Sequence, residues 1–182
     1  YSYGLSLVNA GEGKSTHPTQ ALLDFYTLNK HLGTLEGKKI VIVGDIVHSR
    51  VAKSNIELLS RFGAKIVCCS PDYFEDWTLE HVKYEPNINI ALKDADAVMG
   101  LRIQKERIEN NVPYTQYIAD YQINEKNMPK NAILMHPGPV NRDVEISSTL
   151  LDTKGEIIIE QPRNGVFVRM AVLDLIFEGV QR

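Results

Sequence analysis

The sequence contains little cysteine: its 182 residues include only Cys68 and Cys69, which are adjacent in an apolar stretch. Two neighbouring cysteines cannot build the disulfide framework of a small secreted domain, and their spacing does not suit a zinc site. The five histidines also lack the H-E-x-x-H spacing of a zinc-binding helix. We therefore expect no metal site, and we expect both cysteines to be reduced residues of the core.

The sequence also lacks an excess of charge of one sign and any long apolar run. Its 20 Lys and Arg and 23 Asp and Glu give a net charge of -3, so the basic excess by which proteins bind nucleic acid or anionic membranes is absent. The apolar run at 40–43 is far shorter than the roughly 20 residues that cross a bilayer, and the first residues show no signal-peptide pattern. We expect a cytoplasmic protein without nucleic-acid or membrane partners.

Short β-rich apolar runs alternate with helical patterns along the chain, as is typical of βαβ units around a parallel sheet. The runs predict strands at 39–43, 65–69, 97–101, 132–135 and 157–160, with a weaker sixth at 82–85. The helical patterns lie at 18–32, 50–62, 88–94, 114–125 and 165–177, the first two followed by glycine. The expected fold is α/β: a doubly wound parallel sheet of about five strands, flanked by helices on both faces.

Both ends of the chain depart from this pattern. Residues 1–16 are rich in glycine and lead into a helix without a preceding strand, so we expect them to continue from a segment outside this sequence. The helix at 165–177 is apolar nearly all round, which indicates burial on more than one side. We expect a part outside this sequence to cover it.

The loops after three predicted strands each carry a cation. In an open parallel sheet, ligands bind beyond the carboxyl ends of the strands, where these loops meet. The cations are Arg50, Arg102 and either Arg107 or Arg142. Because the arginine fork matches carboxylates and phosphates, the cluster indicates a small polyanionic substrate; the alternative is that each arginine is an ordinary solvated residue.

Two further segments carry candidate chemistry. His17 precedes Pro18 at the start of a helix, a place suited to binding an anion or stabilising an oxyanion, although Thr16 or His17 alternatively only caps the helix. The turn 136–139, with two prolines, either presents fixed backbone carbonyls to a ligand or is only a rigid turn. Nucleotide motifs are absent: the G-K-S-T at 13–16 lacks the first glycine of a P-loop, and no G-x-G-x-x-G follows a strand.

Taken together, these segments resemble the aspartate carbamoyltransferases. The resemblance runs from about residue 7 to 177, and the stretches that carry it are 9–24, 44–52, 102–107, 135–142 and 164–173. It implies two α/β domains, of which the first, N-terminal one, which binds carbamoyl phosphate, is missing from this sequence. By the same resemblance, 1–16 is a remnant of the interdomain region, 17–33 an interdomain helix, 34–163 the aspartate-binding domain and 164–182 the C-terminal interdomain helix.

The resemblance also implies a reaction and residue roles. The amine of L-aspartate attacks the carbonyl carbon of carbamoyl phosphate, without cofactor or metal, in de novo pyrimidine biosynthesis. His17 would polarise that carbonyl, as the catalytic residue. Carbamoyl phosphate would contact His17, Gln20, Gly138 and Pro139. The carboxylates of aspartate would contact Arg50, Arg102 and Gln104. The family's Ser-Thr-Arg-Thr phosphate segment and mobile-loop lysine are absent from this sequence, so we expect this chain alone to be catalytically incomplete.

Alternatives and partners remain open at this point. The chain is alternatively a non-catalytic dicarboxylate-binding or subunit-interaction module, or a carbamoyltransferase for another amino acid such as ornithine. Ornithine enzymes carry a cysteine after the His-Pro motif that is absent here, which favours aspartate. The family forms homotrimers, in some cases with regulatory chains or dihydroorotase. Asp143 departs from the family pattern, which usually has glycine at this position.

Overall fold

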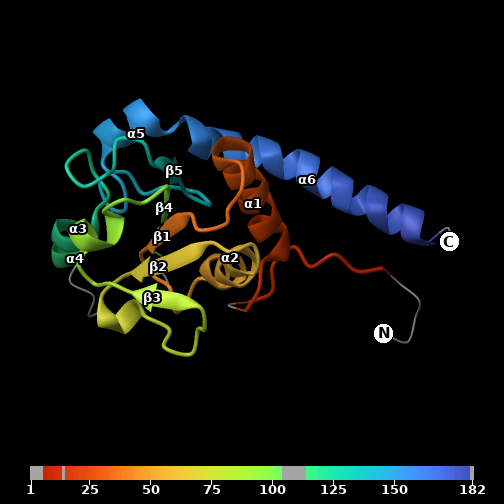
Figure 1. Ribbon diagram of the computed structural model, residues 1–182, viewed down its shortest axis with the longest axis horizontal. Helices are drawn as coiled ribbons and strands as arrows, with labels where there is room; N and C mark the ends of the chain where they lie inside the picture. Colours follow the sequence, from red (N-terminus) through yellow and green to blue (C-terminus); the bar gives the residue numbers. More distant parts are fainter. Residues whose placement is uncertain (1–5, 14, 104–113, 181–182) are drawn as a thin grey trace.

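The computed structural model describes residues 6–13, 15–103 and 114–180, and within them the chain folds around one parallel sheet (Figure 1). The strands are β1 Lys39–Val43, β2 Lys65–Cys69, β3 Val82–Tyr84, β4 Ala97–Gly100 and β5 Ile133–Met135. Their order across the sheet is β3-β2-β1-β4-β5, and every neighbouring pair is parallel. The prediction of a five-stranded parallel sheet is confirmed.

The central strands are buried on both faces, which explains why they are apolar at every position rather than at alternate ones. In β1, Ile40 and Ile42 enter one hydrophobic cluster, whereas Val41 and Val43 enter another. Cys68 and Cys69 of β2 divide between the two clusters in the same way, and both are free and buried. Burial raises the pKa of each thiol to about 12, so they are inert core residues, as predicted.

Helices cover the two faces of the sheet. They are α1 Pro18–Leu32, α2 Arg50–Arg61, α3 Ile88–Leu92, α4 Tyr114–Tyr121, α5 Ser148–Lys154 and α6 Glu156–Val180, with a short 3-10 helix at Asp72–Phe74. The first cluster joins the sheet to α1, α2 and the start of α6, and the second joins it to α3 and α5. This two-sided cover is the doubly wound arrangement that the alternation of elements predicts.

One predicted strand is wrong. Residues 157–160 form the first turns of α6, and the fifth strand of the sheet is instead the weakly predicted segment β3. The side chains of Ile157, Gln161 and Asn164 are all buried, and their spacing of four and three residues places them on one helical face. The apolar pattern hid this helix because two of the three buried residues are polar.

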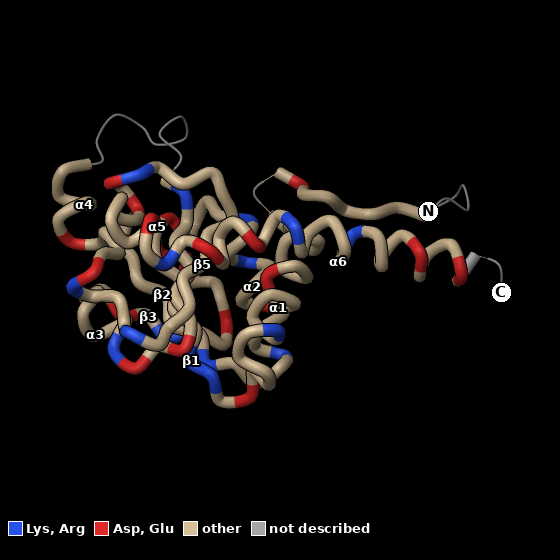
Figure 2. Tube along the Cα trace, turned by 90° about the horizontal axis from the view of Figure 1, so that it is seen from above, with Lys and Arg blue, Asp and Glu red and all other residues tan. Residues whose placement is uncertain are grey.

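The second half of α6 extends beyond the body of the domain, beside the N-terminal segment (Figures 1 and 2). Its large apolar side chains are exposed at Val166, Phe167, Met170, Leu173, Leu175 and Phe177, with exposed fractions between 48% and 69%. Figure 2 shows few charged residues along this half of the helix. Within the described residues, no helix is both long enough and apolar enough to span a membrane.

Candidate active site

The sheet order fixes where a ligand can bind. The chain runs outward from β1 through β2 to β3 and then returns to the other side of β1 as β4. The carboxyl ends of β1 and β4 therefore form the switch point, beyond which doubly wound folds bind their ligands. The loops that follow these two strands begin at Gly44 and Leu101, and the loop after the neighbouring β5 begins at His136. We call the edge formed by these loops the rim.

His17 lies immediately before α1 as its N-cap residue, and it makes no side-chain capping hydrogen bond. Its backbone N–H donates to Ser54 Oγ of α2 over 2.8 Å, which ties the start of α1 to that helix. Partial burial, together with the charges of Arg50 and Arg169, lowers the pKa of the imidazole. An imidazole that nearby positive charges keep neutral is suited to donating a hydrogen bond to an oxygen that becomes negative.

Arg50 is the first residue of α2, whose N-cap Ser49 accepts a hydrogen bond from the backbone N–H of Ala52. The guanidinium group lies directly against Gly11: a Cβ on that residue would come within 2.9 Å of Arg50 Cζ. Gly11 has φ +126°, a conformation that side chains rarely adopt. The glycine-rich segment before α1 therefore provides the space in which Arg50 lies beside His17.

Gln20 belongs to a buried polar network centred on Asp24, whose side chain is completely inaccessible to solvent. Asp24 Oδ1 accepts from Gln20 Nε2 at 3.1 Å and from Gln161 Nε2 at 2.8 Å, and Oδ2 accepts from Asn55 Nδ2 at 2.8 Å. Burial raises the pKa of Asp24 to about 6, against the opposing effect of these three hydrogen bonds. The carboxyl is therefore mainly ionised at neutral pH, as an acceptor in the middle of three amides.

The turn 136–139 is joined to this network through the backbone. His136 N–H donates to Gln161 Oε1 at 2.9 Å, and Gly138 N–H donates to His136 Nδ1 at 2.9 Å. The ring of His136 is buried, and burial together with the charge of Arg102 lowers its pKa to about 3. Gly138 has φ +73°, and the bond from Gly138 to Pro139 is cis. Two hydrogen bonds thus fix the backbone of the turn, one to the side chain of Gln161 and one to the ring of His136.

Arg102 follows β4, and its positive charge is one of the two causes that lower the pKa of His136, the first residue of the turn 136–139. The next residue, Ile103, donates its N–H to the buried carboxylate of Glu145 at 2.8 Å. The same carboxylate accepts from the backbone and the side chain of Asn141, each at 2.7 Å. Glu145 therefore joins the segment of Arg102 to the loop after β5.

Arg142, another predicted cation, does not add to this arrangement. Arg142 pairs with Asp152 at 2.8 Å, on an exposed part of the surface, and this pairing raises its pKa. Gln104 and Arg107 lie outside the described residues. Asp143 has φ +61°, a region that glycine adopts most readily and that Asp tolerates better than most residues, and it accepts from the N–H and hydroxyl of Ser148.

The structure adds residues that the sequence interpretation did not single out. They are Asp24, Asn55, Glu145, Gln161 and Arg169, which orient or surround the predicted groups. The contact of Gln161 with Asp24 joins residues 137 positions apart, and nothing in the local pattern around either residue indicates it. Arg169 stands in the apolar helix α6, and a charged residue on an otherwise apolar face was the one available signal.

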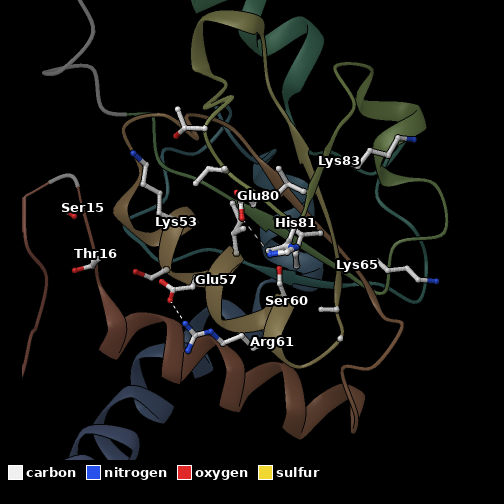
Figure 3. A pocket seen from close by; sticks show the side chains of 18 residues that line it. Ser15, Thr16, Lys53, Glu57, Ser60, Arg61, Lys65, Glu80, His81 and Lys83 are labelled. Atoms are coloured by element: carbon white, nitrogen blue, oxygen red, sulfur yellow. Dashed lines mark hydrogen bonds and ion pairs between the residues drawn. The ribbon is translucent and has the colours of Figure 1, made fainter.

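A hollow of the described surface lies between α2, the strands β2 and β3 and the segment just before His17, of which Ser15 and Thr16 line it (Figure 3). Its volume is about 970 Å³. Two of the cations along it are already paired: Lys53 lies 3.0 Å from Asp76, and Arg61 lies 2.6 Å from Glu57. Lys65 extends away from the hollow in Figure 3. The hollow therefore does not present a convergent group of charges comparable to that at the rim.

Residues 36–176 match the family described as aspartate/ornithine carbamoyltransferase, Asp/Orn binding domain. Since this match covers most of the chain, the chain belongs to the aspartate/ornithine carbamoyltransferase family and carries its Asp/Orn binding domain.

Among curated relatives, the aspartate carbamoyltransferase catalytic subunit of Thermus aquaticus is 50% identical, over 97% of this chain and 60% of that protein. The corresponding subunit of Flavobacterium psychrophilum is 47% identical, over 97% of this chain and 59% of that protein. The chain thus spans about three fifths of the length of these relatives.

Solved structures agree with the fold. Aspartate transcarbamoylase from Trypanosoma cruzi, in complex with carbamoyl aspartate and phosphate, superposes with a TM-score of 0.80 at 31% identity, covering 91% of this chain and 57% of that one. The catalytic subunit of the M. jannaschii enzyme gives 0.79 at 30% identity, covering 93% and 58%. Ornithine carbamoyltransferase from Pyrococcus furiosus gives 0.76 at 24% identity, covering 88% and 56%, which is a likeness of fold alone.

Proposed function

We propose that this chain is the aspartate-binding part of an aspartate carbamoyltransferase. The reaction would transfer the carbamoyl group of carbamoyl phosphate to the amine of L-aspartate, in the cytoplasm, as a step of de novo pyrimidine biosynthesis. The observation that carries the proposal is the placement of cations around the rim: the guanidinium of Arg50 lies against Gly11 and acts with Arg169 on the pKa of His17, and Arg102, after β4, acts on the pKa of His136 in the turn 136–139. Such a grouping suits substrates that carry two carboxylates and a phosphate.

In this proposal His17 donates a hydrogen bond to the carbonyl oxygen of carbamoyl phosphate. The amine nitrogen of aspartate forms a bond to the carbonyl carbon, negative charge gathers on that oxygen, and the bond from carbon to the phosphate oxygen then breaks. One amine proton passes to the departing phosphate, so that carbamoyl aspartate and inorganic phosphate are the products. Because the imidazole has a lowered pKa, it is neutral at pH 7 and donates without giving up its proton.

The remaining predicted residues bind and orient the two substrates. Gln20, Gly138 and Pro139 would contact the carbamoyl group, and Arg50, Arg102 and Gln104 would hold the carboxylates of aspartate. Arg50 and Arg102 follow β1 and β4, the two strands that flank the switch point. Holding both reactants at this point replaces an encounter in solution by a reaction within one site, which contributes much of the rate of two-substrate enzymes.

The rest of the site would come from a further domain. The relatives are longer than this chain, and the exposed apolar side chains of α6 offer a surface for that additional part. We place 1–16 and 17–33 at the link to it, 34–163 in the aspartate-binding domain and 164–182 in the second link. A homotrimer, with or without regulatory chains or dihydroorotase, would complete the assembly.

Carbamoyl transfer with aspartate and with ornithine, measured in parallel, tests this function. The assay uses what we call the completed enzyme, in which this chain is joined to the remaining segment of the Thermus aquaticus relative. We expect carbamoyl aspartate and no citrulline. Product from ornithine instead would reverse the substrate assignment. Absence of both products, together with dicarboxylate binding measured by calorimetry, would support a non-catalytic binding module.

A further inference from the structure

Three parts of the proposed site come from separate segments of the chain: Gln20, Arg50 and the turn 136–139. One buried side chain, that of Asp24, bonds directly to the first and to a residue that positions each of the other two. Asp24 lies one helical turn after Gln20 in α1. It accepts from Asn55 of α2, the helix that Arg50 begins, and from Gln161 of α6, which in turn accepts from the backbone of His136. No other described carboxylate joins these three helices.

The chemistry of a carboxylate determines how these amides are oriented. An ionised carboxyl accepts hydrogen bonds and cannot donate them, so both glutamines must present their NH2 groups to Asp24. Their carbonyl oxygens then face the opposite way. Gln161 shows the consequence, because its Oε1 accepts the N–H of His136 at 2.9 Å. Among the described residues, no hydrogen bond occupies Oε1 of Gln20.

We propose that Asp24 is the positioning residue of the carbamoyl site, which turns Oε1 of Gln20 toward the carbamoyl NH2 group and, through Gln161, holds the turn 136–139 in place. This proposal rests on the function proposed above. Asp24 is completely buried and does not itself contact substrate. Its effect is exerted through the orientation of an acceptor at one side of the carbamoyl group and of the backbone turn at the other.

The buried location also explains why an acceptor rather than an apolar residue stands here. Three N–H donors converge on its two oxygens, two of them on Oδ1. A neutral apolar residue would leave all three amides without an acceptor, which is costly inside a protein. An asparagine would keep one oxygen at the position of Oδ1, the acceptor of both glutamines, and would lose only the hydrogen bond from Asn55.

A double-mutant cycle in the completed enzyme tests the proposal. We expect Asp24→Leu and Gln20→Ala each to lower kcat/KM for carbamoyl phosphate by about tenfold to a hundredfold. In Asp24→Leu, the further change Gln20→Ala should cost less than about threefold, because Gln20 has already lost its orientation. We expect Asp24→Asn, unlike Asp24→Leu, to keep most of the activity of the unsubstituted enzyme. Losses that multiply in the double variant would overturn the proposal.

Thr27→Val provides the matched control for stability. Thr27 is fully buried one turn further along α1, and its hydroxyl accepts from Asn164 of α6 at 2.9 Å. This variant removes a hydrogen bond between α1 and α6, two of the helices that Asp24 joins, but the substituted residue lies away from Gln20. We expect it to lower the unfolding temperature while leaving kcat/KM for carbamoyl phosphate within about twofold. An equal loss of kcat/KM in Thr27→Val would show that Asp24 matters only for stability.

A crystal structure of the completed Asp24→Leu enzyme separates this inference from the proposed function. We expect the amide of Gln20 to leave its position and the turn 136–139 to shift, whether or not the enzyme transfers carbamoyl groups. An unmoved Gln20 and an unmoved turn would overturn the inference, even with full carbamoyl transfer by the wild type. An inactive wild type with a displaced Gln20 in the variant would refute the function and retain the positioning role.

Discussion

At the scale of single residues, the site depends on charges that act on His17 from two elements. Burial and the guanidinium groups of Arg50 and Arg169 all disfavour the imidazolium form. Arg50 is the first residue of α2, which follows the loop after β1, whereas Arg169 comes from α6. The protonation state of His17 is therefore set by the packing of α6 as well as by the rim.

Removing one of these charges should be visible in a titration. We expect Arg169→Gln to raise the pKa of His17, because a nearby positive charge that opposes protonation is lost. The measurement is an NMR titration of the His17 ring in this chain. Arg142→Gln is the control, since Arg142 pairs with Asp152 on the exposed surface, and it should leave the pKa of His17 unchanged. A lower or unchanged pKa in Arg169→Gln would contradict this account.

Arg102 offers the corresponding test for the second substrate. We expect Arg102→Ala in the completed enzyme to abolish activity at ordinary aspartate concentrations, because a buried carboxylate that loses its arginine partner loses about 2–5 kcal/mol of binding. Steady-state kinetics with varied aspartate provide the measurement. Arg61→Ala, which removes a cation paired with Glu57 on the surface, should leave these kinetics unchanged. Unchanged aspartate kinetics in Arg102→Ala would show that Arg102 does not bind aspartate.

At the scale of elements, the sequence predicted the bounds of a helix or strand correctly where particular residues mark its start and its end. Helix α1 has the predicted bounds because Pro18 begins it and Gly33, with φ +71°, ends it. Strands β1 and β2 have the predicted bounds because central parallel strands are apolar throughout. Helix α5 was not predicted, since its seven residues are too few for a clear period, although Ser147 caps it through the N–H of Leu150.

The first turns of α6 show why the strand predicted at 157–160 is wrong. Three consecutive isoleucines at 157–159 have a high preference for strands, but Ile157 packs into the cluster shared with α1. Contacts with distant residues thus outweighed the local preference. The same holds for the site: the loops after the strands were identified from the sequence, whereas the buried carboxyls of Asp24 and Glu145 depend on contacts between distant segments.

The exposed half of α6 gives a prediction at this scale. We expect the double substitution Met170→Lys and Leu173→Lys to change the unfolding free energy of this chain by no more than about 0.5 kcal/mol, because both side chains are exposed. In the completed enzyme, the same change should lower the unfolding temperature, since these side chains would then face another domain. Calorimetry on both proteins provides the measurement.

Ile90→Lys is the control for this prediction. Ile90 is equally exposed, at 54%, but lies on α3. It should have no effect in either protein. Equal tolerance of both changes in the completed enzyme would show that the additional domain does not pack on this half of α6.

At the scale of the whole molecule, the buried imidazole of His136 should make stability depend on pH. Its pKa is lowered to about 3 in the folded chain, from 6.5 for an ordinary histidine. Between these values the unfolded chain binds a proton that the folded chain does not. The contribution of His136 to folding stability is therefore full above about pH 6.5 and falls on acidification, by at most about 1.4 kcal/mol per pH unit.

His136→Asn should reduce this dependence. The asparagine oxygen can still accept from the N–H of Gly138, but the residue no longer titrates. Urea unfolding of both chains between pH 4 and 7 provides the measurement. We expect the unfolding free energy of the wild type to fall more steeply toward pH 4 than that of the variant. If the unfolding free energies of the two chains fall in parallel, His136 takes up its proton in the folded chain as readily as in the unfolded chain.

The 25 residues of α6 give the helix a length of about 37 Å, at 1.5 Å per residue. Gln161 lies near one end, inside the domain, and the exposed apolar side chains lie near the other. One continuous helix therefore carries, within the domain, the amide that accepts from the backbone of the turn 136–139 and, beyond the domain, the apolar surface on which a further domain would pack.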